Sequence, residues 1–394
     1  MTTLVELERS GSTGALSRCT GDAAAFLEEV WGRRALLSRA AAPEGFGDLL
    51  ILDDVDRLLS STSLRTPAFR LVKAGGQIPE AAYTRSGTTG SRPVSGMADP
   101  SRVFALFRQG ATIVLQGLHR YHEPVARFTR ALELELGHSC QVNAYITPPG
   151  AQGLALHDDP HDVFVLQAFG RKAWEVHAAP GEGQREPVRS VIESGDAIYM
   201  PRGTPHAAST QETLSGHLTV GVHVTTWRQL LARAWHGVGD HVSLDDDVPA
   251  GWVRDPEAFA SELSRRIMMV ASTFGGIDTT ELAERETIRF LSTRPSLLRG
   301  ALVDELEVEA IDDETVMRRR DGAICELRTR GDRVLILLGD RRLEMPSWLE
   351  PALRRVALEA SFRVGELAPE IGDAASRAVL ARRLVREGLL RPSD

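Results

Sequence analysis

Residues 152–170, QGLALHDDPHDVFVLQAFG, hold the pattern from which the rest of the chain can be interpreted. Within this stretch His157 and Asp159 are two residues apart. In an extended strand, residues i and i+2 point to the same face, so one strand would bring an imidazole and a carboxylate together. A second imidazole, His206, follows Asp159 by 47 residues, in the segment GDAIYMPRGTPHAAS. These three side chains are therefore candidates for one metal site.

Two histidines and one carboxylate on one face, with the opposite face open, are the ligand set of non-haem Fe(II) oxygenases. Lys172 follows His157 by 15 residues, and the only other lysine in the chain is Lys73. Many oxygenases of this type use 2-oxoglutarate, whose distal carboxylate needs a cation, and lysine suits this task as a compact point charge. His161 adjoins the motif, but Pro160 predicts a bend that takes it off the shared face.

The segments around this motif alternate between short apolar runs and turn residues. Such a series of short strands is typical of a sandwich or barrel rather than of βαβ units. The expected strands are 140–147, 154–159, 162–168, 171–177, 188–192, 196–200 and 217–226. Before them we expect helices that begin at Asp22, at Asp54, after Asp99 and at 119–137, strands at 36–40, 68–75 and 111–118, and a loop at 74–98.

After Thr226 the pattern becomes helical, with expected helices at 227–235, 256–275 and 279–292. These helices are too few for a core of their own, so we expect them to pack on each other and on a partner subunit. Residues 301–394 carry a strand at 334–339 and two amphipathic helices, which suggest a winged helix. This segment has 16 Arg and 19 Asp plus Glu, so it lacks the basic face that DNA binding requires.

Composition limits the class of protein further. The 394 residues are 42% hydrophobic and 25% charged, as in ordinary globular proteins, and the net charge of −8 argues against a nucleic-acid partner. The three cysteines are far apart, which predicts no disulfide framework and fits a reducing cytoplasm. The first residues lack the apolar segment of a signal peptide, and no apolar run approaches the ~20 residues of a membrane helix.

Three segments carry a resemblance to a known family. They are NAYITPPGAQGLALHDDPHDVFVLQAFGRKAW, GDAIYMPRGTPH and HLTVGVH. With them the chain resembles the JmjC-type ribosomal oxygenases, a branch of the cupin superfamily that hydroxylates protein side chains. The resemblance implies an α+β fold: a double-stranded β-helix (the cupin or JmjC jelly roll) at 1–226, a helical dimerisation domain at 227–300 and a winged-helix domain at 301–394.

The same resemblance implies roles for individual residues. The iron ligands fall on His157, Asp159 and His206, and the 2-oxoglutarate lysine falls on Lys172. Positions that line the cosubstrate pocket fall on Tyr145 and Thr219, and a substrate-contacting asparagine falls on Asn143. The implied reaction uses Fe(II), 2-oxoglutarate and O2 to hydroxylate a side chain of a protein or peptide, in a cytoplasmic homodimer.

Two positions depart from the pattern of the histidine-hydroxylating members. The serine that helps to hold their substrate is Gly221 here, and a polar or basic contact on an earlier strand is Val114. The sequence therefore does not assign histidine as the substrate, and demethylation through hydroxylation of an N-methyl group stays open. Three rival functions are a hydroxylase of a biosynthetic peptide or small molecule, a non-catalytic metal-binding cupin scaffold, and a transcriptional regulator, which the acidic C-terminal segment disfavours.

Overall fold

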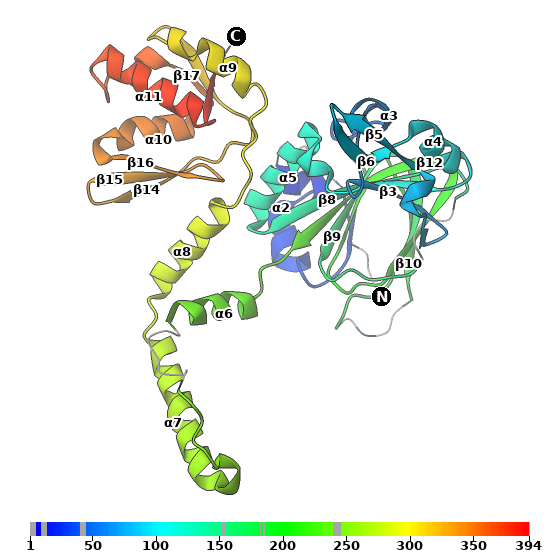
Figure 1. Cartoon of the computed structure of the whole chain (residues 1–394), viewed down its shortest axis with the longest axis horizontal. Helices are drawn as coiled ribbons and strands as arrows, with labels where there is room; N and C mark the ends of the chain where they lie inside the picture. Colours follow the sequence, from blue (N-terminus) through cyan, green and yellow to red (C-terminus); the bar gives the residue numbers. More distant parts are fainter. Residues whose placement is uncertain are drawn as a thin grey trace. The chain divides into compact units, whose positions relative to one another are not determined.

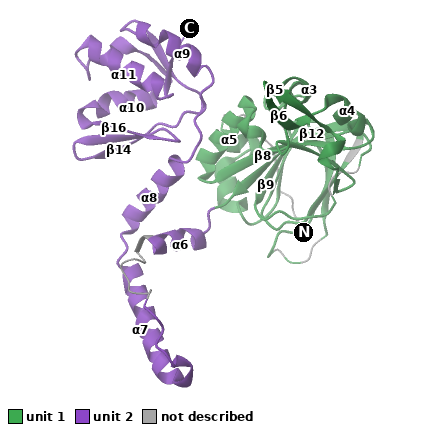
Figure 2. Ribbon diagram, in the orientation of Figure 1, with its two compact units in different colours: residues 1–224 green, residues 225–394 purple. Residues whose placement is uncertain are grey.

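The computed structural model describes residues 5–8, 14–39, 45–151, 155–181, 183, 186–238 and 246–393. The chain divides into two compact units, Met1–Val224 and Thr225–Asp394 (Figures 1 and 2). Residues 152–154 of the opening motif and much of the segment 1–20 lie outside the described residues. Each unit builds its own hydrophobic core.

The first unit is organised around one large sheet. Among the described residues this sheet has ten strands, in the order β1-β2-β11-β9-β12-β8-β7-β3-β4, with β10 paired to β9. Apart from the parallel pair β1 and β2, neighbouring strands run antiparallel. The strands are β1 (Val5–Glu8), β2 (Leu36–Arg39), β3 (Phe69–Lys73), β4 (Gly76–Gln77), β7 (Thr112–Leu115), β8 (Ser139–Thr147), β9 (Asp162–Val176), β10 (Val188–Glu193), β11 (Ala197–Met200) and β12 (His206–His223).

Alternation along β8 separates a core face from a polar face. Four of its side chains are buried in the main core: Cys140, Val142, Ala144 and Ile146. The residues between them, Gln141, Asn143 and Tyr145, point to the other face because side chains alternate along a strand. The core face is covered by helices, which include α1 (Ala15–Thr20) and α5 (Glu123–Leu136). The polar face is therefore the one on which a site can be built.

The two longest strands differ from the sequence-based expectation. Residues 162–168 and 171–177 form one strand, β9, instead of two, and β12 begins at His206, 11 residues before the expected strand at 217–226. Gly170 lies within β9 at a φ of 68°, where an added Cβ would be 1.8 Å from the Leu214 carbonyl oxygen. The sequence analysis therefore took a glycine within a strand for the end of that strand. Glycine is required there because the backbone of β12 comes close to it, and this contact depends on the tertiary structure.

Two further expectations about local structure are wrong. Residues 154–159 do not form a regular strand, since the described part of this segment makes only an isolated bridge between His157 and His206. Residues 74–98 are not one loop, because they hold the hairpin of β5 (Thr84–Thr89) and β6 (Arg92–Ala98). The Gly, Thr, Ser and Pro residues of this segment suggested turns. They nevertheless form an antiparallel pair, because the two strands supply each other's backbone hydrogen bonds.

Helix boundaries in this unit follow capping chemistry. The Asp99 side chain accepts a hydrogen bond from the Arg102 amide at the start of α4 (Pro100–Arg108), with Pro100 in the first turn. The helix α5 ends at Gly137, which adopts a left-handed conformation. By contrast, Asp54 does not precede its helix: α3 (Leu52–Ser61) begins earlier, and the Asp54 carboxylate accepts from the Ile51 amide.

The second unit begins with three helices, α6 (Trp227–Val238), α7 (Pro256–Gly275) and α8 (Thr279–Leu291). Its C-terminal part holds the three-stranded sheets β17-β13-β18 and β14-β15-β16. None of the described helices combines the length and apolarity needed to cross a bilayer. The remaining elements are α9 (Ala301–Glu307), β13 (Val316–Arg319), β14 (Glu326–Arg330), β15 (Arg333–Leu337), β16 (Arg342–Pro346), α10 (Glu350–Leu358), β17 (Ser361–Arg363), α11 (Ala374–Arg386) and β18 (Leu390–Pro392).

Candidate metal centre

Two histidines are brought together by a single backbone bridge. The His157 amide donates to the His206 carbonyl at 3.1 Å, and the His206 amide donates to the His157 carbonyl at 2.8 Å. Residues paired in this way present their side chains on the same face, and the two imidazole centroids are 4.4 Å apart. The start of β12 thus positions one ligand, and the loop before β9 positions the other.

Asp159 completes the group from the same loop. Its carbonyl oxygen accepts from the Gly203 amide at 2.8 Å, which fixes the loop to the turn before His206. Its Oδ2 is 3.7 Å from His206 Nε2. One ligand atom from each of His157, Asp159 and His206 lies within 4.8 Å of the other two. Among the described residues this is the only such group of three histidine, cysteine or acidic side chains.

The protonation of both imidazoles fits a metal. Nδ1 of His157 is 2.8 Å from the Ala155 carbonyl, and Nδ1 of His206 is 2.9 Å from the Thr204 carbonyl. A carbonyl can only accept, so each Nδ1 carries the proton and each Nε2 keeps a free lone pair. Burial also lowers the pKa of His206, which favours the neutral imidazole that a metal needs. The donor set therefore suits a divalent transition metal with open coordination positions.

A buried carboxylate anchors the two loops that carry these ligands. Asp162 is 2% exposed and accepts hydrogen bonds from the Tyr199 hydroxyl and from the Arg202 amide, the latter at 3.1 Å. The Tyr199 hydroxyl in turn accepts from the Gly32 amide at 2.8 Å. Sequence reasoning missed both Asp162 and Tyr199, because nothing in the sequence distinguishes a buried aspartate in HDDPHD from an exposed one.

Lys172 lies on β9 and is 2% exposed. Its Nζ donates to the Thr147 hydroxyl at 3.4 Å, and no carboxylate among the described residues lies within ion-pair distance of it. Burial lowers the pKa of Lys172 to about 7. A buried amine without an anionic partner is costly unless a ligand supplies the charge.

Two other buried polar atoms near these groups also lack partners among the described residues: His217 Nδ1 and Trp174 Nε1. The Trp174 ring is 6.0 Å from the His206 ring and 5.5 Å from the His217 ring, so it links the metal-ligand candidates to His217. Burial lowers the pKa of His217 well below its usual range, and Lys172 adds to the effect. Buried polar groups are rarely left unpaired, so this region fits a small polar ligand such as a dicarboxylate.

The remaining residues singled out by sequence lie on the polar face of neighbouring strands. Val114 is opposite Tyr145, which is opposite His217, and Asn143 is opposite Thr219. Tyr145 stacks on His217 at 5.1 Å, and the Asn143 Oδ1 accepts from the Gly117 amide at 2.9 Å.

The backbone at Gly221 is covered by a histidine ring. The His161 ring lies so close to it that a Cβ added at Gly221 would be 2.8 Å from His161 Cε1. His161 is outside the group of three metal-ligand candidates, and its ring packs against His223 at 5.2 Å. This position therefore has room for no side chain larger than that of glycine.

The curved sheet and the three converging ligands define a cupin-type JmjC domain. Residues 118–230 match the family model described as "JmjC domain". Human ribosomal oxygenase 1 is 30% identical over 224 residues, which cover 52% of this chain and 34% of that protein. A Branchiostoma floridae protein named bifunctional lysine-specific demethylase and histidyl-hydroxylase NO66 is 27% identical over 325 residues, covering 81% of this chain and 48% of that protein.

Solved structures give the same assignment of the fold. The Escherichia coli ribosomal oxygenase YcfD in complex with cobalt and 2-oxoglutarate aligns with a TM-score of 0.54 and 17% identity, over 95% of this chain and 99% of that chain. The chain spans between 34% and 48% of the two curated relatives named above. The resemblance to JmjC-type ribosomal oxygenases that the motifs indicated is confirmed by these matches, and residues 118–230 carry the JmjC domain.

Proposed function

We propose that the chain is an Fe(II)- and 2-oxoglutarate-dependent hydroxylase that acts on a side chain of a protein, with ribosomal proteins as the first candidates. The observation that carries this proposal is the convergence of His157, Asp159 and His206 within 4.8 Å, together with a buried lysine that has no anionic partner among the described residues. The homologues named for ribosomal and histidyl hydroxylation support the class of substrate.

In this mechanism the metal-ligand candidates and the residues of the 2-oxoglutarate pocket have separate tasks. His157, Asp159 and His206 would hold the metal and leave positions open beside it. Lys172 would bind the distal carboxylate of 2-oxoglutarate, and Tyr145 and Thr219 would line the same pocket. Fe(II) with 2-oxoglutarate and O2 supplies the oxidation of a C–H bond, with succinate and CO2 as the other products. The apolar residues around Trp174 keep bulk water away from this chemistry.

The substrate would enter on the side of Asn143, Gly221 and Val114. The first of these supplies a fixed amide, because its Oδ1 is held by the Gly117 amide. The His161 ring lies against Gly221 and narrows the substrate side of the site. A pocket in which a serine at this position holds a substrate histidine would be wider. We therefore propose a substrate other than histidine.

The test is succinate formation with Fe(II), 2-oxoglutarate and ascorbate, with and without ribosomal proteins from a strain that lacks this gene. We expect a mass gain of one oxygen atom on one ribosomal protein. Asp159→Asn should abolish this mass gain. It should also weaken Co(II) binding by more than the ~10–100-fold that is typical when a residue around the metal ligands is changed, because here a ligand itself is lost. Asp158→Asn, which changes the neighbouring carboxylate, is the matched control and should keep Co(II) binding.

The outcomes separate the alternatives. Succinate without a modified ribosomal protein would keep the oxygenase and direct the search to peptides or small molecules. No binding of 2-oxoglutarate by the Fe(II)-loaded protein would contradict the proposal and favour a metal-binding scaffold.

We further propose that 227–300 forms a dimerisation domain and that 301–394 is a winged helix that packs against protein rather than DNA. A homodimer is supported by α7, which has no buried residue along its 20 positions although Leu263, Ile267 and Met268 are apolar. The winged helix is supported by the sheet β17-β13-β18, which packs with α10 and α11 in one core. A cytoplasmic location remains a prediction from the cysteine pattern.

A further inference from the structure

Arg70, on β3, faces the candidate site although no sequence motif includes it. The strand register places Arg70 opposite Val114, which continues the row that leads through Tyr145 to His217. Its neighbours on β3, Phe69 and Leu71, are fully buried in the main core. Because side chains alternate along a strand, the Arg70 side chain lies on the same polar face as Tyr145.

The Arg70 guanidinium is held beside the row of Val114 and Tyr145. Its Nε donates to the Gln116 side-chain oxygen at 2.6 Å. Burial raises the pKa of Tyr145, and the positive charge of Arg70 opposes this rise. The Gln116 amide nitrogen donates in turn to the Pro67 carbonyl at 2.6 Å. These contacts hold the guanidinium in one place. A basic group thus lies beside Val114, on the strand adjacent to it.

The positive charge of Arg70 is not neutralised locally. Within the described part of the chain, no carboxylate oxygen lies within 4.0 Å of its nitrogens, and the residue is only half-buried. Arg39 of the same unit, by contrast, pairs with Asp196 at 2.6 Å. A held but unpaired guanidinium beside a site favours an anionic or strongly accepting ligand.

The neighbouring side chains present donors as well. The Asn143 Oδ1 is occupied by the Gly117 amide, so its NH2 group remains to donate. The Tyr145 hydroxyl can donate its O–H proton to a ligand. Three donor groups and one positive charge therefore lie on this side of the site: the Asn143 amide, the Tyr145 hydroxyl and the Arg70 guanidinium.

We propose that Arg70 is a specificity-determining residue that, with Asn143 and Tyr145, selects a substrate side chain ending in a carboxylate or carboxamide and rejects arginine and lysine. The inference rests on the proposed hydroxylase function, and it names the substrate class for that site. A carboxylate or amide oxygen can accept from all three donors, whereas a cationic side chain meets the like charge of Arg70.

The experiment measures peptide selection by the full-length protein loaded with Co(II) and N-oxalylglycine, an unreactive analogue of 2-oxoglutarate. The probe is a set of peptides of one host sequence whose central residue is Asp, Glu, Asn, Gln, His, Arg or Lys. We expect the acidic and amide peptides to bind about ten- to a hundredfold more tightly than the Arg and Lys peptides, as loss of a charge-assisted hydrogen bond implies.

Three variants assign this selectivity. Arg70→Met should remove the preference while N-oxalylglycine affinity stays at the wild-type value, and Arg70→Lys should keep part of it because the charge remains. Arg108→Met, at an exposed arginine of the same unit, is the control and should bind like the wild type.

Several results would overturn the inference. These are a preference for the Arg and Lys peptides, no detectable binding of any peptide, or an unchanged preference in Arg70→Met. If Arg70→Met weakened N-oxalylglycine binding as much as Lys172→Met, the guanidinium would serve the cosubstrate instead. Failure of the proposed function itself would look different, because the wild-type protein would then not bind N-oxalylglycine.

Discussion

At the scale of single residues, Lys172 shows how burial sets up ligand binding. The amine is 2% exposed, and burial lowers its pKa to about 7, far below that of a lysine in the unfolded chain. The unfolded protein therefore binds more protons than the folded protein between about pH 7 and pH 10.5, so stability rises with pH in this window. Replacing the amine would remove this penalty together with the proposed binding of 2-oxoglutarate.

We expect Lys172→Met to stabilise the ligand-free protein near pH 7 by ~1–4 kcal/mol, as in other replacements of buried charges by apolar groups. The same variant should weaken 2-oxoglutarate binding by about ten- to a hundredfold. Urea denaturation and calorimetric titration measure the two effects. Lys73→Met, at the exposed second lysine, should change neither, and a destabilised Lys172→Met would contradict the assignment of an unpaired amine.

Binding of 2-oxoglutarate should also depend on pH. Its distal carboxylate favours the protonated amine, so above about pH 7 each bound molecule takes up one proton and affinity falls by up to about tenfold per pH unit. Calorimetry of the metal-loaded protein in two buffers of different ionisation enthalpy measures this uptake at pH 8. Proton uptake that persists in Lys172→Met would assign the effect to another group.

At the scale of elements, the metal site depends on how two loops are fixed to the sheet. Asp162, at the start of β9, receives the Tyr199 hydroxyl from β11 and the Arg202 amide from the following turn. We expect Tyr199→Phe to lower Co(II) affinity about tenfold or more while the fold is retained, since outer contacts orient metal ligands. Tyr83→Phe, at another buried tyrosine of the same unit, is the control. Equal Co(II) affinity in both variants would remove Asp162 and Tyr199 from the support of the site.

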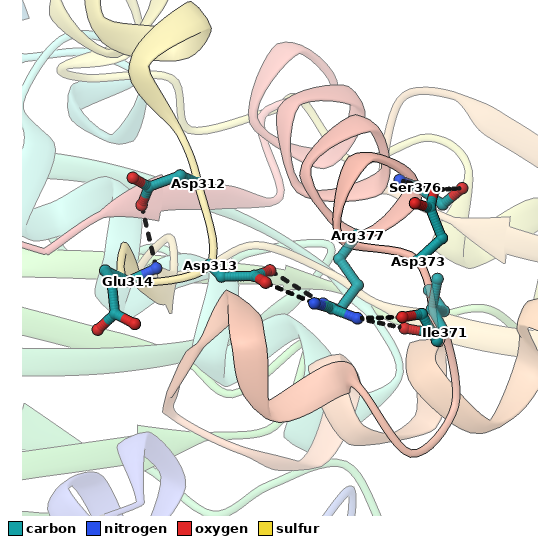
Figure 3. Close-up of polar contacts among 8 residues, drawn as sticks. Asp312, Asp313, Glu314, Ile371, Asp373, Ser376 and Arg377 are labelled. Atoms are coloured by element: carbon teal, nitrogen blue, oxygen red, sulfur yellow. Dashed lines mark hydrogen bonds and ion pairs between the residues drawn. The ribbon is translucent and has the colours of Figure 1, made fainter.

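A comparable anchor in the second unit holds α11. Arg377 is 6% exposed, and its side chain donates to both Asp313 carboxylate oxygens and to the Ile371 and Gly372 carbonyls (Figure 3). Asp373 caps the same helix by accepting from the Ser376 amide at 2.8 Å (Figure 3). The loops before β13 and before α11 thus meet at one guanidinium.

We expect Arg377→Met to destabilise this unit more than a change at an exposed arginine of the same helix, because it leaves a carboxylate and two carbonyls without their donor. Arg383→Met on the exposed side of the same helix breaks only an exposed ion pair with Glu387 and should cost less than ~1 kcal/mol. Urea unfolding monitored by circular dichroism distinguishes the two. A small decrease in the free energy of unfolding of Arg377→Met would mean that water replaces the hydrogen-bond donors of the arginine.

At the scale of the whole molecule, the apolar surface of α7 needs a partner. Leu263 is 47% exposed, Ile267 57% and Met268 68%, although all three side chains are apolar. Light scattering should therefore report a dimer, and Ile267→Glu should shift it towards the monomer by placing a charge in the interface. Ser264→Glu, on an exposed polar position of α7, is the control. A wild-type monomer would contradict the dimerisation proposal.

What the sequence determined by itself was local or tied to a motif. The spacing of His157 and Asp159, the position of His206 and the rarity of lysine were enough to select the candidate site, and alternation and caps placed most strands and helices. The structure brings those three side chains together, although through an isolated bridge rather than the expected strand.

Only the tertiary structure decided how that site is supported and what faces its substrate side. Asp162, Tyr199 and Arg70 act through partners that are distant in the sequence: Asp162 lies 37 residues from Tyr199, Gln116 lies 46 from Arg70, and Gly32 lies 167 from Tyr199. No local pattern records such contacts, because burial and register arise only when distant strands pair. For the same reason the long strands β9 and β12 were recognisable only from the neighbours that satisfy their backbone hydrogen bonds.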